Sequence, residues 1–272
     1  MTDSPSLARV AILGLPTDIN SSYVRGTAQA PRHIREAIFS PSSNLWSETQ
    51  VDLGAPGVVR DAGDLELHED DGDRERIAAG VASILAAGER PLLFGGDHSV
   101  THPVLRAVAR QHGPVGVLHF DAHPDLYDVF QGNRHSHACP FARIMEEGLA
   151  RQLVTVGVRT HNPTQLAQAR RFGVTLIDMD AFSPESVPIP DGPLYVTIDL
   201  DGLDPAFAPG VAHPEGGGLS VRDVVRVLHR ITGRVVGADI VEYLPSADER
   251  GRTAVAAAKL AKELVGLMAR DA

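Results

Sequence analysis

The sequence predicts an α/β fold of three layers, with helices on both faces of a mostly parallel central sheet of about eight strands. Short runs of β-branched and apolar residues alternate with amphipathic helical stretches along the chain, and this alternation is typical of a parallel sheet flanked by helices. The chain has 272 residues, of which 43% are hydrophobic, enough for one large core. We find no convincing linker, so we expect residues 1–272 to form one domain.

The expected strands are apolar runs bounded by turn residues. RVAILGLP at 9–16 and GPVGVLHFDAH at 113–123 show this pattern most clearly. The segment 41–67 is rich in turn residues, and we expect only a short strand there, near Val58 and Val59. The other strands are expected at 90–96, 151–159, 174–180, 192–201 and 233–243.

The expected helices fill the gaps between these strands. APRHIREAIFS at 30–40 has Pro31 in its first turn, where a missing N–H breaks no helical hydrogen bond. DRERIAAGVASILAAG at 73–88 ends at Gly88, a typical residue at the C-terminus of a helix. Further helices are expected at 100–111, about 137–149, 163–172, 221–231 and 248–270.

The composition limits the partners and the compartment of the protein. A formal net charge of −10 argues against a nucleic-acid partner and suits a cationic substrate. No run reaches the roughly 18 apolar residues of a membrane span, so we expect no membrane association. Cys139 is the only cysteine, and MTDSPSLARV resembles neither a secretory signal nor a transit peptide. These features predict a cytoplasmic protein.

Acids and histidines gather where the expected strands end. Asp121, His123 and Asp125 alternate in FDAHPDLYD, and in an extended strand alternate side chains lie on one side. The same argument places Asp199 and Asp201 of TIDLDGLDP together. The carboxyl ends of parallel strands meet at one edge of a sheet, where ligands bind. With the histidine of GGDHS, the candidate ligands are His98, Asp121, His123, Asp125, Asp199 and Asp201.

This ligand set favours two metal ions over one. Six ligands are too many for a single tetrahedral ion, and they suit a pair of divalent cations. Carboxylates without a thiolate favour a hard ion such as manganese over zinc. In isolation, GGDHS could be a capped turn and DLDGLDP an Asp-rich turn. The occurrence of all three segments at strand ends favours the metal site.

GGDHS, DAHPD, TIDLDGLDP and DIVEYLP resemble the four motifs of the ureohydrolase family, the manganese enzymes that include arginases and agmatinases. NSSYVRG at 20–26 and SHACPFARIMEEG at 136–148 are similar to the plant-type arginase branch, and the resemblance covers nearly the whole chain. It implies an arginase-like fold, two Mn²⁺ per chain and a homo-oligomer, either trimer or hexamer. The implied reaction cleaves a small cationic guanidino substrate to urea and an amine, foremost L-arginine to L-ornithine.

The resemblance also implies roles for individual residues. The six candidate ligands would hold the metal pair, with Asp121 and Asp199 bridging the ions. Asp125 would carry the first proton, and His137 of SHACPF would be a mobile acid/base histidine. Glu242 of DIVEYLP would grip the guanidinium through a bidentate pair, with Asp239 as its buried neighbour. The residues expected to contact the substrate are Asn133, Ser136, His137 and Glu242.

Several alternatives stay open at this point. GNRHS resembles a fragment of animal arginases and favours His135 as the acid/base histidine, whereas the longer match of SHACPFARIMEEG favours His137. Arg134 could pair a substrate carboxylate or be a solvated surface residue. Leu244 stands where the plant-type motif has asparagine, so Glu242 lacks the polar neighbour that this motif has at that position. His213 in GVAHPEGGG agrees with the plant-type pattern.

Other functions are also compatible with parts of the pattern. Agmatine or another guanidino acid could replace arginine as substrate. A zinc deacetylase of related architecture needs only two aspartates and one histidine, so His98 and Asp125 disfavour it. A non-catalytic protein of this fold is a third alternative, although every ligand position is filled.

Overall fold

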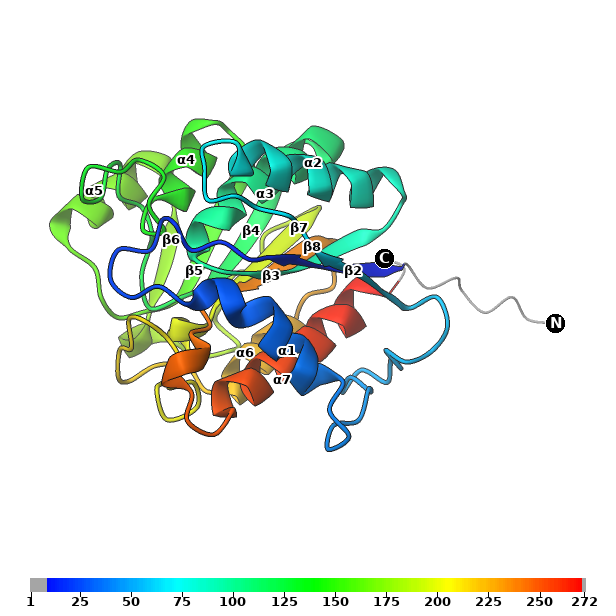
Figure 1. Cartoon of the computed structure of the whole chain (residues 1–272). Helices are drawn as coiled ribbons and strands as arrows, with labels where there is room; N and C mark the ends of the chain where they lie inside the picture. Colours follow the sequence, from blue (N-terminus) through cyan, green and yellow to red (C-terminus); the bar gives the residue numbers. More distant parts are fainter. Residues whose placement is uncertain (1–8, 271–272) are drawn as a thin grey trace.

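The computed structural model describes residues 9–270, and within them eight parallel strands form one central sheet (Figure 1). The spatial order of the strands is β2-β1-β3-β8-β7-β4-β5-β6. The strands are β1 (Val10–Leu15), β2 (Val59–Asp64), β3 (Arg90–Gly95), β4 (Val115–Phe120), β5 (Ala150–Val158), β6 (Thr175–Asp178), β7 (Leu194–Asp199) and β8 (Val235–Val241). The predicted fold class is confirmed, and the strand expected near Val58 and Val59 is β2.

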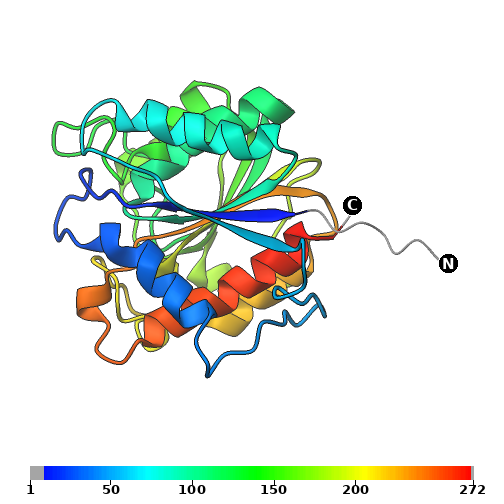
Figure 2. The ribbon, with the colours of Figure 1, turned by 45° about the vertical axis from the view of Figure 1, so that its right-hand side comes forward.

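Helices cover both faces of the sheet. One layer holds α2, α3, α4 and α5, and the other holds α1, α6 and α7; Figure 2 shows the sheet between the two layers. Their bounds are α1 (Ala30–Ile38), α2 (Asp73–Ala86), α3 (Thr101–His112), α4 (Pro140–Glu146), α5 (Pro163–Phe172), α6 (Val221–His229) and α7 (Arg252–Met268). Within residues 9–270, no helix combines the length and the apolarity of a membrane span.

Two expected helices begin later than the sequence indicated. The helix expected from about 137 begins at Pro140, and the residues before it form turns. Proline is favourable in a first turn, where its missing N–H removes no helical bond. The helix expected from 248 begins at Arg252, because the Asp248 carboxylate accepts hydrogen bonds from the backbone of Thr253 and Ala254.

The sheet is buried between two hydrophobic cores. All six residues of β1 are buried, and alternate residues serve opposite faces: Ile12 packs in one core and Leu13 in the other. Such strands read as continuous apolar runs because both faces are covered. The edge strands β2 and β6 are more exposed. The central strands β3, β8, β7 and β4 are therefore held from both faces, and their carboxyl ends have fixed positions.

Close backbone contact fixes the end of β3 against the end of β1. The Gly96 amide donates to the Leu15 carbonyl, and the Asp97 amide donates to the Thr17 carbonyl. A Cβ added at Gly96 would lie 1.8 Å from that Thr17 carbonyl oxygen. Backbone atoms cannot rotate away, so this position requires glycine.

We expect Gly96→Ala to lower the free energy of unfolding by about 1–3 kcal/mol or more, the usual cost of overpacking. The measurement is chemical denaturation of the two proteins. Gly216→Ala is the matched control, because a Cβ there meets no atom within 4 Å. Equal midpoints for the two variants would contradict the steric argument.

Candidate metal centre and active site

The sheet brings the predicted ligands to one edge. His98 follows β3, Asp121 follows β4, and Asp199 ends β7, while Glu242 follows β8. Because β3, β8, β7 and β4 are neighbours in the sheet, these four ends lie side by side. All four side chains are buried.

One ligand group surrounds His98. Its Nδ1 lies 3.4 Å from Asp121 Oδ2, 3.1 Å from Asp125 Oδ2 and 3.2 Å from Asp199 Oδ2. Among the described residues this nitrogen has no hydrogen-bond partner. Buried polar atoms without a partner are rare and need an explanation. A cation between these four side chains would provide it.

A second ligand group surrounds His123. Its Nδ1 lies 3.3 Å from both Asp121 Oδ1 and Asp201 Oδ2. Asp121 thus offers one carboxylate oxygen to each group, and the two groups share it. Asp199, which the resemblance also implied as a bridge, lies in the first group only. The structure therefore offers two overlapping ligand groups, with Asp121 common to both.

The ligands do not share a face of an extended strand, and that expectation is wrong. β4 ends at Phe120, so Asp121, His123 and Asp125 lie in the loop that follows. Asp125 has a φ of 49°, in the left-handed region. Asp201 lies in a short 3₁₀ helix after β7. Tight turns gather these ligands, because alternation along a strand holds only while the backbone stays extended.

Crowding shifts the protonation of the ligands. Burial, together with the charges of Asp201 and Asp121, raises the pKa of Asp199 well above its ordinary value. Burial also raises the pKa of Asp201 to about 6. Although burial favours a neutral imidazole, the surrounding carboxylates raise the pKa of His98 well above its usual range. Buried carboxylates this close are unfavourable without compensating positive charge, and a bound metal ion would supply it.

Two further residues hold the ligands in place, and the sequence patterns did not reveal them. The buried His119 ring contacts Asp121 Oδ2 through Nε2 at 2.7 Å and Thr155 Oγ1 through Nδ1 at 3.2 Å. The Arg159 guanidinium donates to the carbonyls of Asp201, Gly202 and Leu203. A histidine inside a buried strand is a detectable signal for such a role, since it needs polar partners.

His137 and Glu242 face each other beside the ligands. His137 Nδ1 lies 3.2 Å from Glu242 Oε1. The Glu242 carboxylate also accepts a hydrogen bond from the backbone amide of His98 at 2.8 Å. The backbone of Glu242 has a φ of 63°, in the left-handed region. Burial favours a neutral imidazole, but the Glu242 charge raises the pKa of His137 to about 9. Asp239, expected as a neighbour of Glu242, accepts hydrogen bonds from Thr101 and Tyr195.

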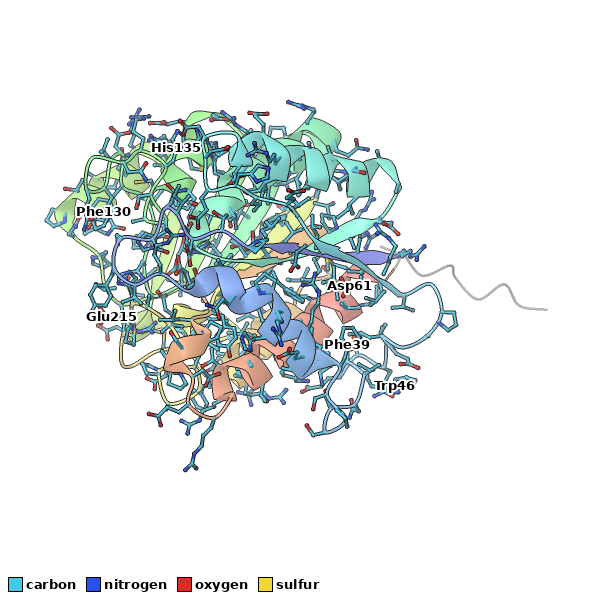
Figure 3. All side chains as sticks on the ribbon, viewed as in Figure 1. Phe39, Trp46, Asp61, Phe130, His135 and Glu215 are labelled. Carbon is cyan, nitrogen blue, oxygen red and sulfur yellow. The ribbon has the colours of Figure 1, made fainter. Side chains whose placement is uncertain are left out.

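The geometry separates His137 from His135. His137 lines a pocket of about 200 Å³ together with Asp125, Asp199 and Asp201. His135 instead stacks on His102 and lines a separate small cavity with Ser136. In Figure 3, His135 lies in the layer of α2 to α5, whereas Phe130, which lines the main pocket, lies at the edge where the strands end.

The other expected substrate contacts lie outside the main pocket. The Asn133 side chain donates to Asn20 Oδ1 at 2.9 Å, and Ser136 is 2% exposed in the neighbouring cavity. Arg134 pairs with Asp128 and Glu146. None of these three residues is among the described residues that line the pocket with His137.

Residues outside the ligand set complete that pocket. His213 is noted in the sequence only for its plant-type pattern, and the other lining residues that the sequence did not predict are Ser22, Tyr127, Phe130, Thr160, His161, Asn162 and Gln165. Thr160 to Gln165 follow β5, a strand that ends at the same edge. The strand-end rule that found the ligands could therefore have found this segment.

Fold and ligands together define an α/β protein with a candidate metal-binding cluster at the carboxyl ends of its strands. Within that class, a model of the arginase family matches residues 8–266. The chain belongs to the arginase family.

Relatives of known name agree with this assignment. "Arginase 1, mitochondrial" of Arabidopsis thaliana is 45% identical over 97% of this chain and 82% of its own length. "Guanidino acid hydrolase, mitochondrial" of Homo sapiens is 34% identical over 96% of this chain and 79% of its own. The solved arginase of Medicago truncatula superimposes with a TM-score of 0.91 at 41% identity, covering 98% of this chain and 89% of that one.

The predicted cytoplasmic location is contradicted by these relatives. The two Arabidopsis thaliana arginases are named mitochondrial and chloroplastic/mitochondrial, and an Oryza sativa arginase is named mitochondrial. The prediction depended on a single cysteine and on the first ten residues. A lone cysteine is equally compatible with any reducing compartment, so it does not separate these locations.

We expect Mn²⁺ to raise the melting temperature of the metal-free protein, because a ligand of the folded state alone stabilises it by about 2.7 kcal/mol at a hundredfold excess over Kd. Asp121→Asn should reduce this shift more than Asp201→Asn, since Asp121 belongs to both ligand groups. Thermal unfolding with and without Mn²⁺ measures the shift. The exposed Asp191→Asn is the control, and equal shifts in all three variants would contradict the shared carboxylate.

Proposed function

We propose that this chain is a ureohydrolase with two Mn²⁺ ions that hydrolyses L-arginine to L-ornithine and urea. The observation that carries this proposal is the pair of ligand groups sharing Asp121, with Glu242 in contact with His137, which lines the same pocket. The plant relatives named arginases support arginine as the substrate.

The ligand chemistry supports manganese. The two groups consist of carboxylates and imidazoles, and Cys139 belongs to neither. Such ligands favour a hard divalent ion, and the unpartnered His98 Nδ1 fits a metal ligand. Bound divalent ions supply hydroxide near neutral pH, because they lower the pKa of water.

Glu242 is suited to orient the guanidinium. Burial raises the pKa of its carboxyl, but the His137 imidazole and the His98 amide lower the pKa below its ordinary value overall. The group is therefore an anion at neutral pH. A carboxylate pairs with two guanidinium N–H groups in a fork, which fixes both the distance and the angle of the planar carbon.

His137 and Asp125 are suited to move protons. The pKa of His137 is raised to about 9, so its ring carries a proton at neutral pH. The departing amine needs such a proton when the C–N bond breaks. Asp125 lines the same pocket, and its carboxylate is placed to accept the proton of the attacking water.

The alternative functions differ in strength. Proclavaminate amidino hydrolase from Streptomyces clavuligerus superimposes with a TM-score of 0.84 at 34% identity, covering 97% of this chain and 93% of its own, so a different guanidino tail is the main alternative. A zinc deacetylase is disfavoured, because a single-ion site leaves the His98 group without a role.

The trimer or hexamer implied by the family resemblance is part of this proposal, and light scattering would test it.

We expect the manganese-loaded protein to release urea from arginine, and Glu242→Gln to lower kcat/KM by about 10- to 100-fold. A neutral amide keeps the shape but loses a charged hydrogen-bond pair, typically about 1.5–3 kcal/mol. Urea release measures both. Glu249→Gln, an exposed acid after β8, is the control.

The same assay can reject the function. Agmatine, guanidinobutyrate and guanidinopropionate are tested beside arginine. Failure to release urea from any of them, combined with cleavage of an acetylated amine, would exclude the ureohydrolase proposal.

The far side of the pocket determines which tail fits. Apart from the metal ligands, the described residues of its lining include no carboxylate and no arginine or lysine. The Asn162 side chain already has partners: its Oδ1 accepts from the backbone N–H of Gln165, and its Nδ2 donates to the Tyr127 hydroxyl. Gln165 is 5% exposed, and its Oε1 has no partner among the described residues. Gln165 Oε1 is therefore one polar atom of the lining that a substrate tail could hydrogen-bond.

We expect Gln165→Glu to raise the ratio of kcat/KM for agmatine over guanidinobutyrate by about tenfold, because a carboxylate attracts the ammonium tail and repels the carboxylate tail. Steady-state urea release gives the ratio. Thr164→Glu adds the same charge at an exposed neighbour that does not line the pocket. A ratio that moves equally in both variants would show a general charge effect and reject a role for Gln165.

A further inference from the structure

The loop after β1 contacts the His137 ring, although 115 residues separate the two in sequence. Ser22 Oγ lies 2.8 Å from His137 Nε2. In Figure 1 this loop lies at the edge of the sheet where the strands end, as do the loops before α4. The contact joins the NSSYVRG segment to the SHACPF segment.

The loop that carries Ser22 is closed on itself. The buried Asp18 carboxylate accepts from the Gly26 amide at 2.6 Å, from the Ala28 amide at 3.1 Å and from Arg25 Nε at 2.7 Å. The arginine and these amides lower the pKa of Asp18 despite its burial, so the carboxylate is charged at neutral pH. Its bonds hold the two ends of the loop together.

Asn20 fastens this loop to the turn after β3 and to the loop before α4. The backbone N–H of Asn20 donates to Asp97 Oδ2 at 2.9 Å, and its side-chain Nδ2 donates to Ser99 Oγ at 3.0 Å. Both partners lie just after the end of β3. Its Oδ1 accepts from Asn133, and its carbonyl accepts from the His137 amide at 3.2 Å. Ser22 therefore stands on a rigid support, and its distance to His137 is set by backbone contacts.

Both nitrogens of the His137 ring have partners. Nδ1 faces the Glu242 carboxylate at 3.2 Å and Nε2 faces the Ser22 hydroxyl at 2.8 Å. The His213 ring stacks on the His137 ring, with centroids 5.1 Å apart and an interplanar angle of 19°. A carboxylate only accepts, so Nδ1 carries the hydrogen of that pair. Nε2 is the nitrogen that gains and loses a proton.

A hydroxyl suits this position because it can reverse its role. When Nε2 is bare, the Ser22 hydroxyl donates to it; when Nε2 carries a proton, the same oxygen accepts. The ring thus keeps one orientation in both protonation states. Ser22 also lines the pocket, so its second hydrogen-bonding position is open to solvent or substrate.

We infer that Ser22 is a positioning residue, which holds the His137 ring in one orientation while Nε2 exchanges its proton. This inference depends on the proposed ureohydrolase function for its catalytic consequence. It also changes the expectation of a mobile histidine, because the loop after β1 restrains the ring. Ser22 acts through His137 and needs no contact with the reacting carbon.

The test compares three variants. We expect Ser22→Ala to lower kcat for arginine about tenfold, the effect of losing one hydrogen bond to a charged group, while KM changes less than about twofold because Glu242 still binds the guanidinium. Ser22→Thr keeps the hydroxyl and should recover kcat to within about threefold. Ser21→Ala is the matched control, since among the described residues its Oγ has no hydrogen-bond partner.

The pH profile distinguishes positioning from general loop support. The titratable groups that face His137 are Glu242, Asp125, Asp97 and His213, and none of them is changed by these variants. Loss of the Ser22 acceptor destabilises the charged ring, so the alkaline limb of kcat should move to lower pH in Ser22→Ala. Ser22→Thr and Ser21→Ala should keep the limb of the unchanged protein.

A second measurement does not require activity. NMR titration of the labelled His137 ring in the manganese-free protein should give a lower pKa in Ser22→Ala than in Ser21→Ala. Equal pKa values, or equal kcat and pH profiles in the two variants, would overturn the inference. If no guanidino compound yields urea, the proposed function fails while this titration still decides whether Ser22 holds the ring. An equal Mn²⁺-induced melting shift in both variants confirms that they fold.

Discussion

The structure depends on burying a concentrated set of negative charges at one edge of the sheet. Asp121, Asp125, Asp199 and Asp201 lie within two overlapping groups, and all four are at most 6% exposed. Each buried carboxylate is costly unless positive charge and hydrogen-bond donors surround it. Three histidines contact Asp121, and a bound metal ion would add the remaining positive charge. The fold can tolerate this set because two apolar cores hold the strands from both sides.

Local backbone geometry serves the same requirement. Asp125 and Glu242 have positive φ angles, a conformation that costs energy for residues other than glycine and is concentrated at functional sites. A Cβ at Gly202 would lie 2.8 Å from the Asp121 amide nitrogen, so the turn after β7 can approach the turn after β4 only with glycine there. Burial of the apolar sheet stabilises the fold. This stability offsets the conformational cost of the turns that direct the ligand side chains into the site.

The sequence predicted the strands and the ligand segments because both are local patterns. A buried parallel strand reads as an apolar run, and a metal ligand is recognisable by its residue type at the end of that run. The turns were predicted less well: Asp121, His123 and Asp125 gather through a left-handed turn, which alternation along a strand does not describe. Contacts between distant segments, such as Ser22 with His137, leave no periodic signal, since each partner reads alone as an ordinary loop residue. The same holds for Asn133, whose side chain turns toward Asn20.

The sheet order also shapes how the chain can fold during its synthesis. β8, the last strand along the described residues, lies between β3 and β7. Until residues 235–241 leave the ribosome, the nascent chain has two unsealed strand edges in the middle of the future sheet, and exposed edges invite pairing with other chains. Pairing over such long sequence separations is slow. The centre of the sheet can therefore close only after residues 235–241 have emerged, and until then the edges of β3 and β7 are open to pairing with other chains.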